Sequence, residues 1–319
     1  MPYAIRLHQN GGPEVLSWET VEVQAPAAGE ATIRHHAVGL NYIDTYHRTG
    51  LYPVTLPSGI GMEGAGVVEA VGEGVSELKV GDRVAYAGGP LGAYADVRNI
   101  PKLPDAISFE TGAAMMLQGL TAAYLLRKTY RVQPGDAVLI QAAAGGVGLI
   151  VCQWARALGA TVIGTVGSPA KAELAKAHGC HHVINYSTEN FAQRVREITN
   201  GEGVAVVYDG VGKDTFAGSL DSLRPMGMMV SFGNASGPVP PLDLIVLSQK
   251  GSLFVTRPTL MNYTAKREDL VALGSELFDV VVSGQVKIEV NQTYALKDAA
   301  QAHRDLEARK TTGSTILLP

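Results

Sequence analysis

The chain has 319 residues, a hydrophobic fraction of 46%, a charged fraction of 18% and a formal net charge of −4. This length favours two domains, and an acidic balance without a basic cluster excludes the usual signature of a nucleic-acid partner. The two cysteines, Cys152 and Cys180, are too few for a disulfide scaffold and indicate a reduced, cytoplasmic environment. No apolar run has the length of a signal peptide or a membrane span, so we expect a soluble protein without a membrane anchor.

Short strand-like segments separated by glycine turns run to about residue 120. The segment 31–34 alternates apolar and polar residues, 66–72 is β-branched and bounded by glycine, and 82–86 follows another glycine. Repeated short strands of this kind predict an antiparallel barrel or sandwich.

The pattern changes near Pro134, where apolar strand-like runs begin to alternate with longer helical patterns. Six strands with intervening helices predict a doubly wound parallel α/β sheet. The predicted strands are 137–141, 161–165, 182–184, 204–209, 228–232 and 253–256, and the predicted helices are 147–158, 169–178 and 189–199.

The tail holds a predicted helix at 268–283 and ends in a strand at 314–318. A terminal strand with no sheet of its own is expected to return to the first domain. We therefore predict a nucleotide-binding domain at 123–256, inserted between two parts of a catalytic domain at 1–122 and 257–319.

A glycine-rich turn, 142–148, joins the strand at 137–141 to the next helix. Its small residues let the backbone turn sharply and approach a pyrophosphate, while the start of the helix offers free N–H groups. Gly148 is expected to let helix and strand pack closely. The turn is weak evidence alone, but its place in a complete six-strand pattern predicts a dinucleotide site.

The end of the next strand indicates which dinucleotide binds. Folds that bind NAD commonly place a carboxylate there, whereas the segment 167–171 offers Ser168 and Lys171, and the first acid, Glu173, comes later. A hydroxyl and an ammonium group suit a 2′-phosphate, which predicts NADPH. The alternative is that Lys171 is an ordinary solvated helix residue.

Five separated segments carry a resemblance to a known family: 41–53, 61–66, 80–84, the turn 145–148 with Gln153, and 311–317. Over its whole length the chain resembles the quinone oxidoreductases (the zeta-crystallin-like family) of the zinc-free medium-chain dehydrogenase/reductase superfamily. The resemblance implies a GroES-like, mainly β catalytic domain, an inserted Rossmann domain and a homodimer.

The resemblance also implies site residues. Lys171 and Tyr186 would flank the 2′-phosphate, with Arg309 a third contact, and Asn41, Tyr46 and Tyr52 would line the substrate end. The remaining implied cofactor contacts are Gly145, Gly146, Val147, Gly148 and Ser168 along the phosphates and ribose, and Phe232, Gly233, Asn234, Phe254, Val255 and Thr256 toward the nicotinamide. Bacterial relatives often carry lysine where this chain has Gln118, which puts in doubt any contact that needs a cation there.

Metal binding is not expected. Zinc-dependent relatives have histidine where Met62 stands and cysteine near Asn41, and their cysteine-rich loop is replaced here by 88–93. Zinc prefers thiolates and imidazoles. The adjacent pairs at 35–36 and 181–182 are histidines, but neighbouring residues on a strand point to opposite faces.

These features together predict an NADPH-dependent quinone reductase that uses no metal. Few strong acids or bases are in view, and hydride delivery to a quinone needs none, because the cofactor carries the difficult step. Tyr46 and Tyr52 have the alternative of being ordinary core aromatics, and Asp44 is expected to be a structural partner for a cation. The rival functions are an enone or enal reductase and a cofactor-binding stress or RNA-associated protein with low turnover.

Overall fold

The computed structural model describes residues 2–88, 94–96 and 101–319. The chain forms two compact units. The first unit comprises Met1–Leu120, Thr264–Val282 and Ile288–Pro319, and the second comprises Thr121–Tyr263 and Ser283–Lys287. The predicted domain limits, 1–122 with 257–319 and 123–256, place the segments 121–122, 257–263 and 283–287 differently, and they stay a prediction.

The second unit is built on a sheet of six parallel strands in the order β10-β9-β8-β11-β12-β13. The strand that comes first in the chain, β8, lies in the middle, so the strand order reverses between β8 and β11. Ligands of such sheets bind at this reversal, beyond the carboxyl ends of the strands. The predicted doubly wound parallel sheet is confirmed. Its strands are β8 (Ala137–Ile140), β9 (Thr161–Val166), β10 (His182–Asn185), β11 (Val204–Asp209), β12 (Leu223–Ser231) and β13 (Phe254–Thr256).

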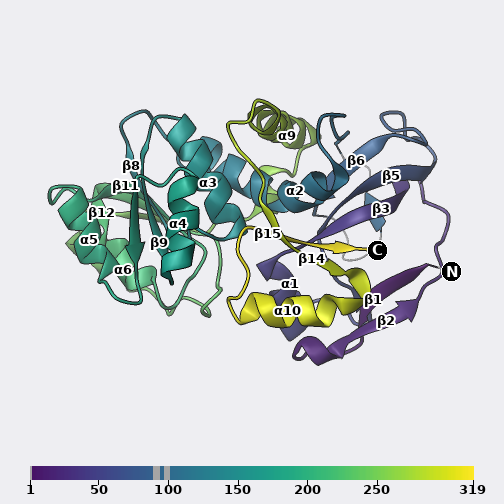
Figure 1. Ribbon diagram of the computed structural model, residues 1–319, viewed down its shortest axis with the longest axis horizontal. Helices are drawn as coiled ribbons and strands as arrows, with labels where there is room; N and C mark the ends of the chain where they lie inside the picture. The colour runs from purple at the N-terminus through teal and green to yellow at the C-terminus, as the bar shows by residue number, and fades with distance from the viewer. Residues whose placement is uncertain (1, 89–93, 97–100) are drawn as a thin grey trace. The chain divides into compact units, whose positions relative to one another are not determined.

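Helices cover both faces of this sheet. The helices α3 (Gly146–Ala157) and α4 (Pro169–Ala177) lie on one face, and α5 (Phe191–Ile198) and α6 (Phe216–Asp221) lie on the other (Figure 1). The three helices that were predicted, α3, α4 and α5, begin within two residues of their predicted starts. The short helices α7 (Ile245–Gln249) and α8 (Leu260–Tyr263) and a π-helical turn (Leu125–Thr129) complete the unit.

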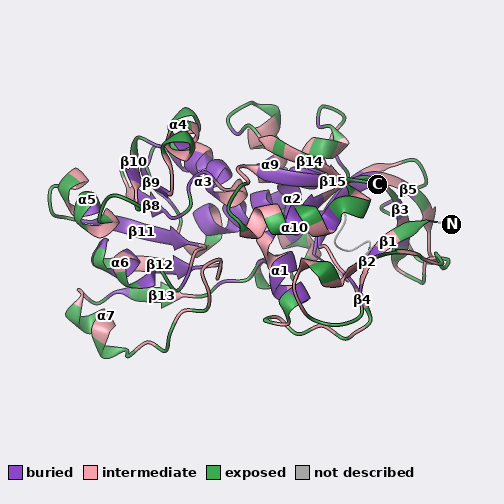
Figure 2. Ribbon diagram, turned by 60° about the horizontal axis from the view of Figure 1, so that its bottom comes forward, coloured by how far each residue is buried: buried purple, intermediate pink, exposed green. Residues whose placement is uncertain are grey.

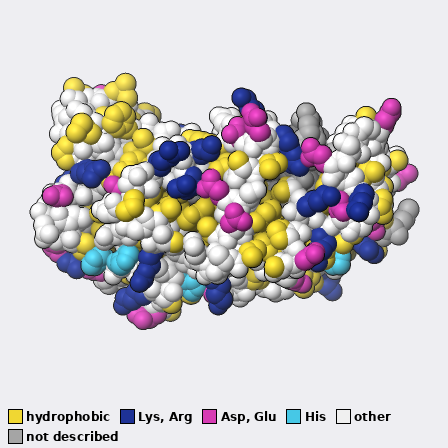
Figure 3. Space-filling model, turned by 90° about the horizontal axis from the view of Figure 1, so that it is seen from above, with side chains coloured by type: hydrophobic (Ala, Val, Ile, Leu, Met, Phe, Trp, Pro, Cys, Tyr) yellow, Lys and Arg dark blue, Asp and Glu magenta, His cyan; other side chains and the backbone are white. Residues whose placement is uncertain are grey.

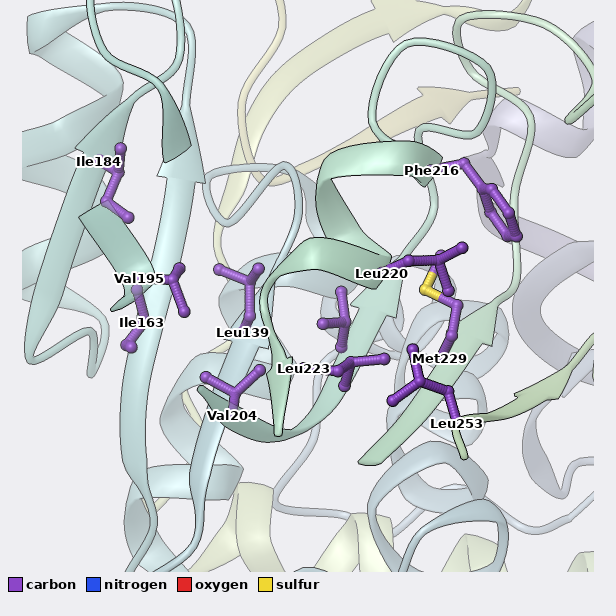
Figure 4. Close-up of a cluster of buried hydrophobic side chains, with 11 residues drawn as sticks. Leu139, Ile163, Ile184, Val195, Val204, Phe216, Leu220, Leu223, Met229 and Leu253 are labelled. Atoms are coloured by element: carbon purple, nitrogen blue, oxygen red, sulfur yellow. The ribbon is translucent and has the colours of Figure 1, made fainter. Parts of the chain in front are cut away.

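Branched apolar side chains fill the space between the sheet and the helices α5 and α6. The central strand β11 is buried at all of its residues (Figure 2). Leu139 and Met229 from the sheet pack in one cluster with Phe216 and Leu220 of α6 and Val195 of α5 (Figure 4). A strand buried on both faces reads as a continuous apolar run, which is why the sequence of β11 was recognisable. This core holds the carboxyl ends of the strands in fixed positions.

The first unit contains two sheets. The strands of the smaller sheet have the order β2-β1-β4, and the larger sheet has the order β14-β15-β3-β5-β6, with β7 also paired to β3. All pairs are antiparallel except β14 with β15. The strands are β1 (Tyr3–Leu7), β2 (Leu16–Thr20), β3 (Glu30–Leu40), β4 (Ser58–Gly59), β5 (Glu63–Val71), β6 (Arg83–Ala87), β7 (Tyr94–Asp96), β14 (Val290–Ala295) and β15 (Ser314–Leu318).

The terminal strand returns to the first unit as expected. Thr315 of β15 faces Leu40 of β3 in an antiparallel ladder, so residues from opposite ends of the chain share one sheet. This pairing brings Ser314 close to the start of helix α1.

Helices of the first unit were only partly predicted. The prediction of strands alone up to about residue 120 missed α1 (Tyr42–Thr49) and α2 (Phe109–Tyr124), and α10 (Ala299–Glu307) was also missed, whereas α9 (Arg267–Val282) was expected. Ala113, Met115 and Leu120 of α2 are all buried, so this helix lacks the polar stripe that reveals an amphipathic helix. Two 3₁₀ turns, Pro13–Val15 and Leu296–Asp298, complete the unit.

Charges of both signs are interspersed on the molecular face shown in Figure 3, where basic and acidic side chains lie next to each other. Within the part of the chain that the structure describes, no helix is long and apolar enough to cross a membrane.

Candidate active site

The glycine turn joins β8 to α3 at the point where the strand order reverses. Gly145 donates its N–H to the carbonyl of Ala142 at 3.0 Å, and Ala143 donates to the carbonyl of Thr165 in β9 at 2.9 Å. Ala142 has a φ of 54°, a left-handed conformation that a residue with a Cβ rarely adopts and that a functional turn often contains. Because the N-cap is Gly145, no side chain caps the first turn of α3, and its N–H groups suit an anion.

Gly148 has no room for a side chain. A Cβ there would lie 2.4 Å from the carbonyl oxygen of Ala142 and 2.8 Å from backbone atoms of Ala143. Backbone atoms cannot rotate aside, so only glycine lets α3 pack this closely against the turn. The sequence predicted close packing of helix and strand at Gly148; the close approach seen is to the turn that follows the strand. A narrow backbone cradle at the start of a helix fits the pyrophosphate of a dinucleotide.

Gly148→Ala is expected to destabilise the turn by about 1–3 kcal/mol, the usual cost of overpacking, and to weaken dinucleotide binding. Chemical denaturation and a cofactor titration measure the two effects. The matched control is Gly274→Ala in α9, where a Cβ would meet nothing within 4 Å and alanine stabilises the helix by about 0.5–1 kcal/mol. Equal stability and equal cofactor affinity for Gly148→Ala and Gly274→Ala would contradict the proposal that the turn at Gly148 forms the phosphate-binding cradle.

The residues predicted for the 2′-phosphate gather at the carboxyl ends of β9 and β10. Ser168 caps α4, accepting from the backbone N–H of Lys171 at 3.4 Å. A Cβ on Gly167 would lie 2.6 Å from the hydroxyl of Tyr186, so this tyrosine lies directly against the segment. Glu173 pairs with Lys176 at 3.0 Å on the exposed side of α4. The segment 167–171 thus has hydroxyls and an ammonium group at hand and no carboxylate.

The residues predicted for the nicotinamide side follow β12 and form β13. Val230 of β12 faces Thr256 of β13, which makes the segments 232–234 and 254–256 neighbours at one edge of the sheet. A Cβ on Gly233 would lie 2.3 Å from the carbonyl oxygen of Gly210, so the loops after β11 and β12 also approach closely. Arg309 belongs to the first unit, and its contact with the cofactor stays a prediction.

A buried polar cluster under these loops was not predicted. The Asp209 carboxylate accepts from the backbone N–H groups of Val211 and Gly212 at 2.8 and 3.0 Å. It also accepts from the hydroxyls of Thr215 and Ser219 at 2.7 and 2.9 Å. The chain of contacts continues through Gln141 to Thr165. Asp209 is the last residue of an apolar strand, and that position was the signal that could have revealed it.

A second buried polar chain lies in the first unit and contains Asn41. The amide nitrogen of Asn41 donates to Glu63 at 2.6 Å, and that of Gln118 donates to the amide oxygen of Asn41 at 3.1 Å. Ser314 lies 2.7 Å from the amide oxygen of Gln118. Gln118 therefore hydrogen-bonds to both neighbours through its amide group. These contacts do not need the cation that a lysine would place at this position. Glu63 stood in a recognised motif but carried no predicted role.

The expectation that Asp44 pairs with a cation is wrong. Its carboxylate accepts from the backbone N–H of Asn41 at 2.8 Å, which closes the capping box at the start of α1. A helix N-terminus attracts a carboxylate without any cation. Burial raises the pKa of Asp44 to about 7.

Tyr46 and Tyr52 lie together, with ring centroids 5.1 Å apart in an edge-to-face arrangement. The backbone N–H of Tyr52 also donates to the carbonyl of Tyr46 at 3.1 Å. Tyr46 is 8% exposed, so both the substrate-lining role and the alternative of a core aromatic stay open. A cavity of about 650 Å³ in the same unit is lined by Asp44 and Glu63 among other residues, and Asn41, Tyr46 and Tyr52 do not line it.

The adjacent histidines diverge as expected. His35 lies 2.9 Å from the hydroxyl of Tyr86, whereas the ring of His36 stacks on Phe109. In the described ranges, no group of three or more histidines, cysteines, aspartates and glutamates is placed to hold a metal ion. The residues 89–93, most of the predicted replacement for the cysteine-rich loop, lie outside the described residues. Cys152 and Cys180 are free and buried, with sulfur atoms 3.3 Å apart.

Two family models match the chain. Residues 27–103 match the alcohol dehydrogenase GroES-like domain, and residues 146–273 match the zinc-binding dehydrogenase model. Together with the doubly wound sheet and its glycine turn, these matches define a medium-chain dehydrogenase/reductase with a GroES-like and a Rossmann-like part.

Individual relatives narrow the class further. The chain is 55% identical to the quinone oxidoreductase of Pseudomonas aeruginosa, with 100% of both chains covered. It is 51% identical to the crystal structure of Escherichia coli quinone oxidoreductase complexed with NADPH, with a TM-score of 0.98 and 100% of both chains covered. It is also 47% identical to the 2-haloacrylate reductase of a Burkholderia species, covering 100% of this chain and 99% of the relative. The chain belongs to the quinone oxidoreductase family.

Proposed function

We propose that this protein is an NADPH-dependent quinone reductase that works without a metal. The observation that carries the proposal is the backbone cradle at Gly148 beside a strand end that has Ser168, Lys171 and Tyr186 and no carboxylate. The first feature fits a pyrophosphate and the second fits a 2′-phosphate. The names of the relatives at 51–55% identity support the same cofactor and substrate.

Each group of residues has a task in this function. Bound NADPH would supply the hydride. The uncapped N–H groups at the start of α3 bind the pyrophosphate, and the segments 232–234 and 254–256 orient the nicotinamide half. Either Asn41 or Tyr46 donates a hydrogen bond to the quinone oxygen as negative charge develops there. The protein thus orients two rings and excludes water, and the reduced oxygen takes its proton from water.

A second candidate, reduction of an enone or enal, has a specific observation in its favour, namely the 2-haloacrylate reductase at 47% identity. Hydride addition to a conjugated carbonyl uses the same donor and the same oxygen contact. The other rival, an RNA-associated protein of low turnover, is disfavoured by the net charge of −4, because RNA binding needs a concentrated basic surface.

Steady-state oxidation of NADPH against a panel of quinones and enones tests the proposal. Turnover with quinones, with smaller kcat/KM for enones and no loss after treatment with a metal chelator, is the expected result. Preference for enones would establish the second candidate, and salt-sensitive RNA binding without turnover would establish the third.

Replacing Tyr46 or Tyr52 by phenylalanine is expected to change kcat by less than about tenfold. A group that must donate a proton contributes about 100- to 10,000-fold, whereas we expect these tyrosines, whose rings meet edge to face, to line the substrate end of the site without an obligatory proton transfer. The kcat of Tyr46→Phe and Tyr52→Phe, measured with folding checked by circular dichroism, decides the matter. A loss of the full general-acid size for Tyr46→Phe would mean that this hydroxyl is an obligatory proton donor.

We further propose a homodimer in the cytoplasm. The strand β13 is the last in the strand order of the parallel sheet, among the residues that the structure describes, and so lies at an edge of this sheet. Its Phe254 is 58% exposed. An apolar strand at the edge of a sheet readily pairs with a second chain. Analytical ultracentrifugation is expected to give a dimer, and a monomer at micromolar concentration would refute this assembly.

A further inference from the structure

The buried polar chain of the first unit has a direction. Taking the side chains in order, Ser314 donates to Gln118 over 2.7 Å, Gln118 donates to Asn41 over 3.1 Å, and Asn41 donates to Glu63 over 2.6 Å. The second oxygen of Glu63 accepts from the backbone N–H of Leu117 at 2.8 Å. Each side chain in this series donates toward Glu63, and Glu63 itself only accepts. An ionised carboxylate requires this arrangement because it has no proton to donate.

The hydroxyl of Ser314 has two acceptors within reach. One is the amide oxygen of Gln118 at 2.7 Å, and the other is the backbone carbonyl oxygen of Ala114 at 3.0 Å. A hydroxyl carries one proton and can donate to only one of them at a time. The far end of the chain therefore has an alternative partner already in place.

A proton on Glu63 makes the opposite direction the better one. A protonated Glu63 donates to the amide oxygen of Asn41, so both amides must turn over to keep donors facing acceptors. Asn41 then donates to Gln118, Gln118 donates to Ser314, and Ser314 turns its hydroxyl to Ala114. Each contact between neighbouring side chains keeps one donor and one acceptor in both directions, which a buried network needs in order to be stable.

We propose that Gln118 and Asn41 form a relay between Glu63 and Ser314 whose hydrogen bonds reverse direction when Glu63 gains or loses a proton. Gln118 is the positioning residue of this relay, because its amide both donates and accepts. A cation at the same position can only donate and would hold the relay in one direction.

The surroundings of Glu63 favour a proton near neutral pH. Burial raises the pKa of Glu63 to about 8, the nearby Asp44 of α1 also raises it, and the hydrogen bonds from Asn41 and Leu117 lower it. The other titratable groups that face this region are Tyr86 of β6 and His35 of β3. Burial raises the pKa of Tyr86 and lowers the pKa of His35 to about 4. Both are uncharged at neutral pH, so the described groups around Glu63 supply no positive charge.

The relay has a consequence that rests on the proposed function. Asn41 is one of the two residues proposed to donate to the developing quinone oxygen, and turning its amide over exchanges the positions of its N–H groups and its carbonyl oxygen. The protonation state of Glu63 thereby determines whether an N–H group of Asn41 is placed to donate to the substrate. The kcat/KM for quinone is expected to change with a midpoint near pH 8.

Nuclear magnetic resonance of the full-length, isotope-labelled protein tests the relay without reference to activity. Between pH 5.5 and 9.5, three signals are expected to move with one common midpoint near 8: the Glu63 carboxyl carbon, the Gln118 amide nitrogen and the Ala114 carbonyl carbon. Ala114 is the remote reporter, because it gains or loses the hydroxyl of Ser314. If Glu63 titrates while Gln118 and Ala114 stay still, or if Glu63 titrates below pH 5, the relay is refuted.

Two variants hold the relay in opposite directions. Glu63→Gln keeps an oxygen for Leu117 and presents an amide nitrogen to Asn41, as the protonated acid does, so the pH-dependent movement of Gln118 and Ala114 should vanish. Gln118→Lys adds a donor-only cation and should lower the Glu63 midpoint by about 1–3 pH units. Unchanged midpoints in both variants would overturn the proposal, and if either fails to fold, the wild-type titration decides alone.

The pH profile of kcat/KM separates the relay from the proposed function. A wild-type midpoint near 8 that Glu63→Gln abolishes supports both. A relay seen by magnetic resonance with no quinone turnover refutes the function and leaves the relay intact, while turnover with a profile that Glu63→Gln does not alter refutes the link between them.

Discussion

Lys171→Ala is expected to weaken NADPH binding by about ten- to a hundredfold and to leave NADH binding unchanged. A hydrogen bond to a charged group contributes about 1.5–3 kcal/mol, which corresponds to that range of affinity. The 2′-phosphate that distinguishes NADPH adds about two negative charges. Lys171 lies in the first turn of α4, next to the Ser168 cap and the Gly167 segment against which Tyr186 lies. NADH lacks the phosphate and has nothing to lose there.

Equilibrium titration of both cofactors with wild type and variant checks this result. Lys176→Ala is the matched control, because it removes a lysine from the same helix whose partner is the exposed Glu173, and it should leave both affinities unchanged. Equal losses for NADPH and NADH in Lys171→Ala, or a wild type that prefers NADH, would remove the basis for the NADPH assignment.

The parts of this protein that its sequence predicts are those whose signal is local. The strand β8, the glycine turn and the helix α3 follow each other within the segment 137–157, so one short stretch contains the whole phosphate-binding motif. The apolar run of β11 likewise predicts a buried parallel strand from consecutive residues. The absence of a carboxylate after β9 is also read from consecutive residues.

Two helices that were missed, α1 and α2, lack such a periodic signal. α2 is buried around Ala113, Met115 and Leu120, and an apolar helix without a polar face has no periodic pattern to detect. α1 has only eight residues, too few for a clear period. Tertiary burial makes α2 helical, whereas the start of α1 is also marked locally by its capping box at Asn41 and Asp44.

The relay could not be predicted either, because its contacts join residues far apart in the chain. Asn41 and Glu63 are 22 residues apart, Asn41 and Gln118 are 77 apart, and Gln118 and Ser314 are 196 apart. One sequence carries no information about such pairs. The wrong expectation for Asp44 has a related cause, because a search for a cation overlooked the helix N-terminus that the residue itself caps.

Asp209→Ala is expected to cause a large loss of stability in the second unit, by about 2–6 kcal/mol. The carboxylate, which is fully buried, accepts from the backbone N–H groups of Val211 and Gly212. Those two donors would be left without an acceptor, and each unsatisfied buried donor costs about 1–3 kcal/mol. The hydroxyl of Thr215 has a second acceptor, the carbonyl of Gly212 at 3.3 Å. The hydroxyl of Ser219 also loses the carboxylate, so the loss should lie toward the upper end of this range.

Urea denaturation and NADPH titration measure the consequences for stability and for the cofactor. Asp209→Asn keeps one oxygen for Val211 and Gly212 and should cost clearly less, whereas Asp214→Ala removes an exposed carboxylate from the same loop and should change stability by less than about 0.5 kcal/mol. Because Gly210 lies against Gly233 of the predicted nicotinamide segment, loosening this loop should also weaken NADPH binding in Asp209→Ala. If Asp209→Ala were as stable as Asp214→Ala, the carboxylate would not be what holds the loop after β11 in place.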